Sequence, residues 1–104
     1  MKYALRVDDR AHDEIIFALH QLGDPERKIR FRAELENAID TILEFPDIFP
    51  TLKVVGIKTD LVVRRVLLRG FYHGLIYTVL HEIEVVRVPK CYYTRSHPET
   101  WLQD

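Results

Sequence analysis

The chain has 104 residues, of which 47% are hydrophobic and 30% charged, a composition typical of one folded domain over residues 1–104 and not of a disordered chain. Its single cysteine excludes an internal disulfide, and no apolar run approaches the roughly 20 residues that span a bilayer, so we expect a cytoplasmic protein with no membrane partner. The net charge of -1 conceals a split: residues 1–50 carry seven Lys and Arg against eleven Asp and Glu, whereas residues 51–104 carry eight against five. This asymmetry between the halves indicates an anionic partner or an oppositely charged protein.

The chain begins with a pattern typical of a half-buried strand. Residues 2–7 alternate, with one side formed by Tyr3, Leu5 and Val7 and the other by Lys2, Ala4 and Arg6. Asp8 and Asp9 follow and offer an N-cap. From residue 10 the apolar period changes to 3.6, which predicts a helix that ends at Gly23.

A second helix is predicted directly after the first. Asp24 supplies an N-cap and Pro25 a proline at the first helical position, and the apolar stripe continues to Phe45, just before Pro46. The short connection predicts an antiparallel helical hairpin. The acidic residues along both helices, Glu14 included, are interpreted as their solvated faces.

The second half is predicted to form three strands after a loop over residues 46–61. β-Branched and aromatic residues predict these strands over 62–69, 73–80 and 82–88, and residues 89–104 read as a polar and aromatic tail. The order β-α-α-β-β-β predicts an α+β fold in which the helical hairpin packs on one face of an antiparallel sheet, with the first strand at its edge. The other face of the sheet is expected to be at least partly open.

Basic side chains mixed with aromatic rings are the main chemical signal of the second half. Basic groups neutralise phosphates and rings stack on bases, so the pattern suits a nucleic-acid surface, and it suits an acidic protein segment equally well. Ordinary solvated strand positions are the third interpretation. The residues concerned are Arg64, Arg65, Arg69, Arg87, Lys90 and Arg95, interleaved with Tyr72, Tyr77, Tyr92, Tyr93 and His97.

Other kinds of site find little support. The five histidines show no compact spacing with cysteine or carboxylates, and the four glycines form no phosphate-cradling loop, so neither a metal nor a cofactor is expected. A lone cysteine such as Cys91 is more often inert than reactive. His97, beside Arg95, is interpreted either as an acid–base group acting on a phosphodiester or as part of a surface tail.

Several motifs occur together in a definite order. The most specific stretch runs from Arg64 to Val79 and combines a basic pair, an apolar strand, a Phe-centred turn and an Ile-x-Tyr-x-Val strand. The other motifs are Ala11-x-x-Glu14-Ile15-x-x-Ala18, Phe31-x-x-x-Leu35-x-x-Ala38-Ile39-x-x-Ile42 and Arg95-x-x-Pro98-x-x-Trp101. In this spacing the chain resembles the RelE/ParE superfamily of bacterial toxin–antitoxin toxins over nearly its whole length, closest to the ParE-like plasmid stabilisation branch. It departs from the family at Lys90, where the family usually has His, and at Tyr92-Tyr93, where a basic pair is usual.

The resemblance implies a growth-inhibiting toxin of a type II toxin–antitoxin system, neutralised by a cognate antitoxin that wraps around it. The overall pattern leans towards the ParE-like mode, in which the toxin poisons DNA gyrase and is not an enzyme. The alternative is the RelE-like mode, a ribosome-dependent mRNA endoribonuclease. A non-toxic small domain that binds RNA or protein is the further alternative.

The resemblance also implies site residues and an assembly. The catalytic residues implied for the RelE-like mode are Arg65, Arg87, Lys90, Tyr93, Arg95 and His97. The binding residues implied are Arg64, Arg69, Tyr77, Tyr92 and Trp101. The expected partners are the antitoxin and either gyrase or the ribosome with its mRNA, in a homodimer or a toxin–antitoxin hetero-oligomer.

Overall fold

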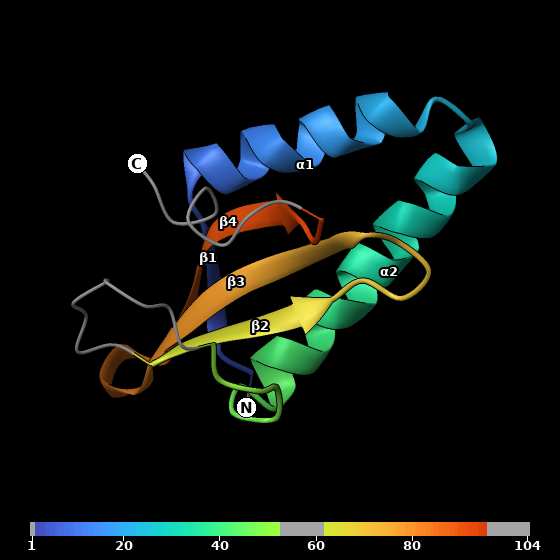
Figure 1. Cartoon of the computed structure of the whole chain (residues 1–104). Helices are drawn as coiled ribbons and strands as arrows, with labels where there is room; N and C mark the ends of the chain where they lie inside the picture. The colour runs from blue at the N-terminus through green and yellow to red at the C-terminus, as the bar shows by residue number, and fades with distance from the viewer. Residues whose placement is uncertain (1, 53–61, 96–104) are drawn as a thin grey trace.

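The computed structural model describes residues 2–52 and 62–95, and these form an α+β fold (Figure 1). The predicted order of strands and helices is confirmed. The elements are β1 (Ala4–Val7), α1 (Asp9–Leu22), α2 (Pro25–Glu44), β2 (Val63–Leu67), β3 (His73–Leu80) and β4 (Val85–Tyr93), with a short 3-10 turn, η1 (His81–Ile83), between the last two strands.

The described strands form one mixed sheet in the order β1-β4-β3-β2. β2, β3 and β4 pair antiparallel, as the short connections between them require. β1 lies at the edge, as predicted, but it runs parallel to β4 with Arg6 beside Arg87, so the prediction of an antiparallel sheet is wrong for this pair. β1 is linked to the other strands through two helices, and a connection of that length leaves the strand direction free.

Both helices cover the same face of the sheet (Figure 1). Ala11 and Ala18 of α1 and Phe31 and Ile42 of α2 are buried there. They pack against the strand residues Val66, Leu68, Leu75, Tyr77, Val86 and Val88. The predicted pair of helices with a short connection is present, but the helices spread apart from that connection like a V, because α1 packs along β4 more than on α2. Within the described residues, neither helix combines the length and the apolar character needed to cross a membrane.

The aspartates at the N-termini of the two helices have different roles. Asp24 caps α2, because its side chain accepts a hydrogen bond from the Glu26 amide at 3.0 Å, as predicted. Asp8 occupies the N-cap position of α1 in an extended conformation but makes no side-chain cap bond. Its carboxylate is held instead by Arg87 of β4.

β4 continues to Tyr93, so the predicted strand end at Val88 is wrong and the start of the expected tail belongs to the sheet. Pro89 was the misleading residue, because proline lacks the amide hydrogen that a central strand uses. Proline is tolerated at bulges and at sheet edges, and β1 ends beside Val88, which leaves Pro89 at an edge.

A bulge in β4 then changes which side chains face the helices. Thr78 of β3 pairs with Arg87, whereas Ile76 pairs with Lys90, so β4 holds an extra residue in this interval. After the bulge, Cys91 joins the core under the helices. The next residue, Tyr92, packs with Ile76 on the opposite, open face.

Candidate functional site

Two residues expected to bind a partner make internal contacts in the structure. Arg64 donates Nη1 to the main-chain oxygens of Asp47 and Phe49, at 3.2 and 2.7 Å. Tyr77 is buried and donates its hydroxyl to the carbonyl of Pro46 at 3.0 Å. Burial raises the pKa of Tyr77 to about 12. Both side chains therefore hold the segment after α2 against the sheet.

Arg87 lies on the open face and forms a two-pronged ion pair with Asp8. Its Nε donates to Oδ1 at 3.0 Å and its Nη2 to Oδ2 at 2.6 Å. This hydrogen bonding lowers the pKa of Asp8 and raises that of Arg87. The Arg87 side chain remains 43% exposed, so its remaining N–H groups can face solvent.

Lys90 is only 7% exposed and is paired with Glu14 of α1. Its ammonium donates to Glu14 Oε2 at 2.9 Å, and the Cys91 amide donates to Oε1 of the same carboxylate at 3.2 Å. Glu14 thus neutralises the buried Lys90 ammonium and accepts a hydrogen bond from the Cys91 amide. That amide lies on the part of the β4 edge that extends beyond β1. The interpretation of Glu14 as part of a solvated face is wrong.

The end of the open face nearest the β2–β3 turn holds Arg65 and Tyr92. Arg65 stands opposite Ile76 in the sheet. Burial raises the pKa of Tyr92, and the nearby Arg65 guanidinium offsets part of this effect. The Tyr92 ring lies over Gly74, where a Cβ atom would be 2.9 Å from the ring, so only glycine leaves it room.

A group of aromatic and basic residues, the rim cluster, gathers where β3 begins and β4 ends. It consists of Tyr72, His73, Tyr93 and Arg95. The Arg95 guanidinium lies 4.0 Å from the centre of the Tyr72 ring, a cation–π contact. The Tyr93 ring packs edge-on against Tyr72 and His73, with centroid distances of 6.4 and 5.5 Å. Tyr93 and Arg95, which are about 20 positions from Tyr72 in the sequence, are thus placed beside Tyr72, which the sequence had singled out, and His73, which it had not.

Burial sets the protonation of two groups near the rim cluster. It lowers the pKa of His73, whose ring also packs edge-on against Phe31, so the imidazole is neutral at pH 7. Within the described residues, His73 Nδ1 is buried without a hydrogen bond. Burial raises the pKa of Cys91 to about 12, which makes its thiol a poor nucleophile, as expected from the sequence.

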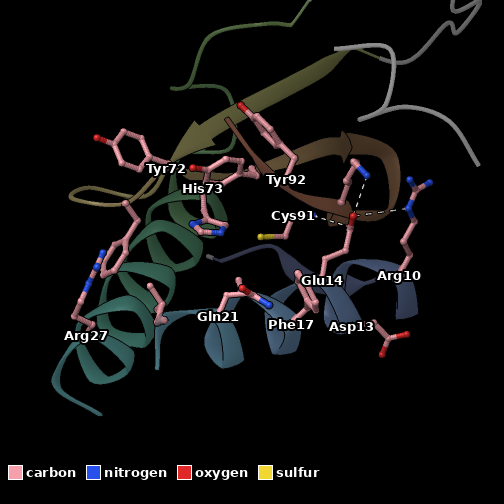
Figure 2. Close-up of a pocket in the computed structure, with 15 residues that line it drawn as sticks. Arg10, Asp13, Glu14, Phe17, Gln21, Arg27, Tyr72, His73, Cys91 and Tyr92 are labelled. Carbon is pink, nitrogen blue, oxygen red and sulfur yellow. Dashed lines mark hydrogen bonds and ion pairs between the residues drawn. The ribbon is translucent and has the colours of Figure 1, made fainter. Parts of the chain in front are cut away.

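A groove of about 1210 Å³ opens beside the rim cluster, between α1 and the end of β4 (Figure 2). Phe17 and Gln21 line it from α1, Arg27 from α2, and His73 and Tyr92 from the sheet. The spread of the two helices creates this space, because α1 alone flanks the end of β4.

The remaining site residues are less informative. Arg69 is exposed just after β2. His97 and Trp101 lie outside the described residues. Tyr72 is among the aromatic residues that the sequence singled out, whereas His73 and Asp8 were not predicted as site residues. Nothing local connects Asp8 with Arg87, 79 positions away.

Fold and site together define a class of protein: a small α+β chain whose helices cover one sheet face, while the other face and the adjoining rim carry basic and aromatic side chains. Solved structures of this class are similar over nearly the whole chain. A mutant of the E. coli toxin RelE in the free state is 26% identical, with 97% of this chain and 94% of that chain covered and a TM-score of 0.64. The intact E. coli RelBE toxin–antitoxin complex is 26% identical, with 90% and 99% covered and a TM-score of 0.60.

The YoeB dimer from Staphylococcus aureus shares the fold at 16% identity, with 89% and 98% covered and a TM-score of 0.58. No family model matches the sequence, and no curated protein matches it at a significant level. The solved RelE structures place the chain in the RelE/ParE-like superfamily of toxin–antitoxin toxins.

Proposed function

We propose that the chain is the toxin of a type II toxin–antitoxin pair and that it cleaves mRNA on the ribosome, the RelE-like mode. The observation that carries this proposal is its similarity to RelE at 26% identity over 97% of the chain. The open face and the rim cluster support it, because cations and rings gather there at the end of the sheet.

The chemistry of RNA cleavage explains how the rim cluster would act. Attack by the 2′-oxygen forms a P–O2′ bond and breaks the P–O5′ bond. A base must therefore take the proton from O2′, an acid must give one to O5′, and a cation must stabilise the charge on the phosphoryl oxygens. In this proposal the neutral His73 imidazole and the Tyr93 hydroxyl transfer protons, and Arg95 stabilises the charge. Arg65 binds the chain alongside Tyr92 on the open face.

A second candidate function, poisoning of DNA gyrase, is favoured by a different observation. Arg87 and Lys90 are held in ion pairs with Asp8 and Glu14. Two of the cations expected to contact RNA are therefore paired with carboxylates, and one of them, Lys90, is buried, whereas Arg87 stays 43% exposed. A toxin that grips a protein target needs no free catalytic cations, so this arrangement suits the ParE-like mode.

One paired assay separates the two modes. The chain is expressed under tight control, growth is followed, cleavage sites in cellular mRNA are mapped, and supercoiling by purified gyrase is measured. Growth arrest with mRNA cleavage, lost in Tyr93→Phe and Arg95→Ala and kept in the surface control Arg32→Ala, is the expected result. Growth arrest with intact mRNA and inhibited supercoiling would overturn the nuclease proposal in favour of gyrase.

A test of the partner complements this assay. An E. coli complex of RelE with its antitoxin is among the similar structures, so we propose a small antitoxin encoded beside this chain. Co-expression of that neighbouring reading frame should restore growth and yield a stable complex on purification. Unchanged growth when the chain is expressed alone would contradict the toxin proposal itself.

A further inference from the structure

Three arginines lie along the open face on different strands of the sheet. Arg65 extends from β2, opposite Ile76. Arg87 extends from β4, opposite Thr78. Arg6 is the Cα partner of Arg87 in the parallel β1–β4 pair, so the two side chains leave the sheet on the same side, on strands about 4.8 Å apart.

Two like charges directly across neighbouring strands repel each other, so Arg6 and Arg87 need anions beside them. Asp8 supplies one, and it is close to both, because the charge of Arg6 adds to the effect of Arg87 in lowering the pKa of Asp8. One carboxylate cannot balance two guanidinium groups. Asp9 and Arg10, which line the same place, offset each other, so a net positive charge remains at this point of the open face.

The same residues surround a polar hollow of about 520 Å³, whose charged lining consists of Arg6, Asp8, Asp9, Arg10 and Arg87. Asp8 uses the Nε and one Nη2 hydrogen of Arg87, and it fixes the plane of the guanidinium. The other N–H groups are left for a second acceptor, since a guanidinium carries five donors.

We propose that Arg6 and Arg87 bind a backbone phosphate of the RNA substrate, with Asp8 as the positioning residue for Arg87. This inference rests on the proposed RNA cleavage and adds a second contact point to it. His73 in the rim cluster and Thr78, which pairs with Arg87, are five residues apart on β3. At about 3.3 Å per residue this is roughly 17 Å, and the odd spacing places the two side chains on opposite faces of the sheet, so the RNA would pass over the rim and the pair would hold a phosphate other than the one that reacts. The arginine pair would thus set the register of the RNA and leave the chemistry to the rim.

The test compares variants matched in charge. Asp8→Asn and Asp9→Asn each remove one negative charge, and Asn remains a good N-cap at position 8. Asp9 lines the same hollow, but the side-chain hydrogen bonds of Arg87 within the described residues go to Asp8, so the two variants match in charge and place and differ in the hold on Arg87. If charge alone mattered, both variants would bind RNA more tightly than the wild type. If Asp8 positions Arg87, Asp8→Asn should bind about fivefold more weakly than Asp9→Asn.

Binding of a short single-stranded RNA is measured by fluorescence anisotropy at several salt concentrations. Arg6→Ala and Arg87→Ala should each reduce the slope of log K against log salt by about 0.7, the contribution of one phosphate contact on single-stranded RNA. Arg87→Lys keeps the charge but lacks the fork that Asp8 grips, so it should resemble Asp8→Asn. Arg32→Ala, an exposed arginine of α2, is the control and should leave the slope unchanged. Thermal unfolding of every variant confirms that it is folded.

The outcomes separate this inference from the proposed function. If the wild type cleaves mRNA but Arg6→Ala and Arg87→Ala keep the wild-type salt slope, the phosphate site is wrong and the nuclease proposal stands. If these variants lose affinity only for the antitoxin, the pair binds an acidic protein segment and the inference is likewise overturned. If the wild type inhibits gyrase and neither cleaves nor binds RNA, both proposals fall together.

Discussion

Removal of the Glu14 carboxylate should cost more stability than the removal of any ordinary surface acid. In Glu14→Ala the Lys90 ammonium, 7% exposed, keeps its charge and loses its acceptor. The Cys91 amide loses its acceptor as well. Breaking one side of a buried ion pair typically costs 3–5 kcal/mol, and the 28% exposure of the Glu14 side chain reduces that figure to about 2 kcal/mol.

The lost amide hydrogen bond adds about 1 kcal/mol, and the slightly better helix propensity of alanine subtracts a few tenths. The expected total is about 3 kcal/mol. For a domain of this size, this lowers the melting temperature by roughly 15 °C, and the protein stays folded at 25 °C. Urea unfolding followed by far-UV circular dichroism measures the difference directly.

Two further variants make the reasoning testable. Glu36→Ala removes an exposed acid of α2 and should change the unfolding free energy by less than about 0.5 kcal/mol. Adding Lys90→Met to Glu14→Ala removes the unpaired charge and should recover about half of the loss. A Glu14→Ala variant as stable as Glu36→Ala would show that the pair contributes nothing and would refute the reasoning.

Three other predictions follow from single contacts. Gly74→Ala should destabilise the fold by about 1–3 kcal/mol and change the near-UV circular dichroism, because the new Cβ displaces the Tyr92 ring; an unchanged spectrum and unfolding midpoint would contradict the close contact. Tyr77→Phe should cost about 1 kcal/mol and remove the absorbance step near pH 12, because the buried tyrosine has a raised pKa. The neutral hydroxyl of Tyr77 stabilises the fold fully below pH 10 and loses that effect as the pH rises towards 12. Between pH 10 and 12 the Tyr77→Phe variant should therefore lose less stability than the wild type. The pKa of Asp8 is lower in the folded protein than its ordinary value of 3.8, so the ion pair with Arg87 stabilises the fold fully above pH 3.8. The wild type should therefore be more stable than Asp8→Asn at neutral pH. This difference in stability should disappear as the pH falls through the lowered pKa.

Local patterns were sufficient for most of the fold. The 3.6 period and the Asp24-Pro25 restart placed both helices within a residue or two. β-Branched runs placed β2 and β3. These features depend on neighbours in the sequence, which is why a single sequence reveals them.

What the sequence missed depends on residues far apart. The parallel direction of β1 and the splay of the helices follow from tertiary packing, for which no local residue codes. The extension of β4 through Pro89 depends on a bulge and on the absence of β1 beyond Val88. For the site, the basic and aromatic composition singled out Tyr93 and Arg95, and the structure brings them together with the rings of Tyr72 and His73.

The charge split between the halves has a structural meaning that composition could not supply. The acids of the first half are not merely a solvated exterior, because Asp8 and Glu14 reach across to the two cations of β4, Arg87 and Lys90. The two pairs differ in kind. Lys90 is buried, so Glu14 removes its charge from any outside partner, whereas Arg87 stays 43% exposed and is only oriented by Asp8. The surface available to a partner is therefore smaller than the basic half. It contains only those cations that the acidic residues of the first half leave in contact with solvent.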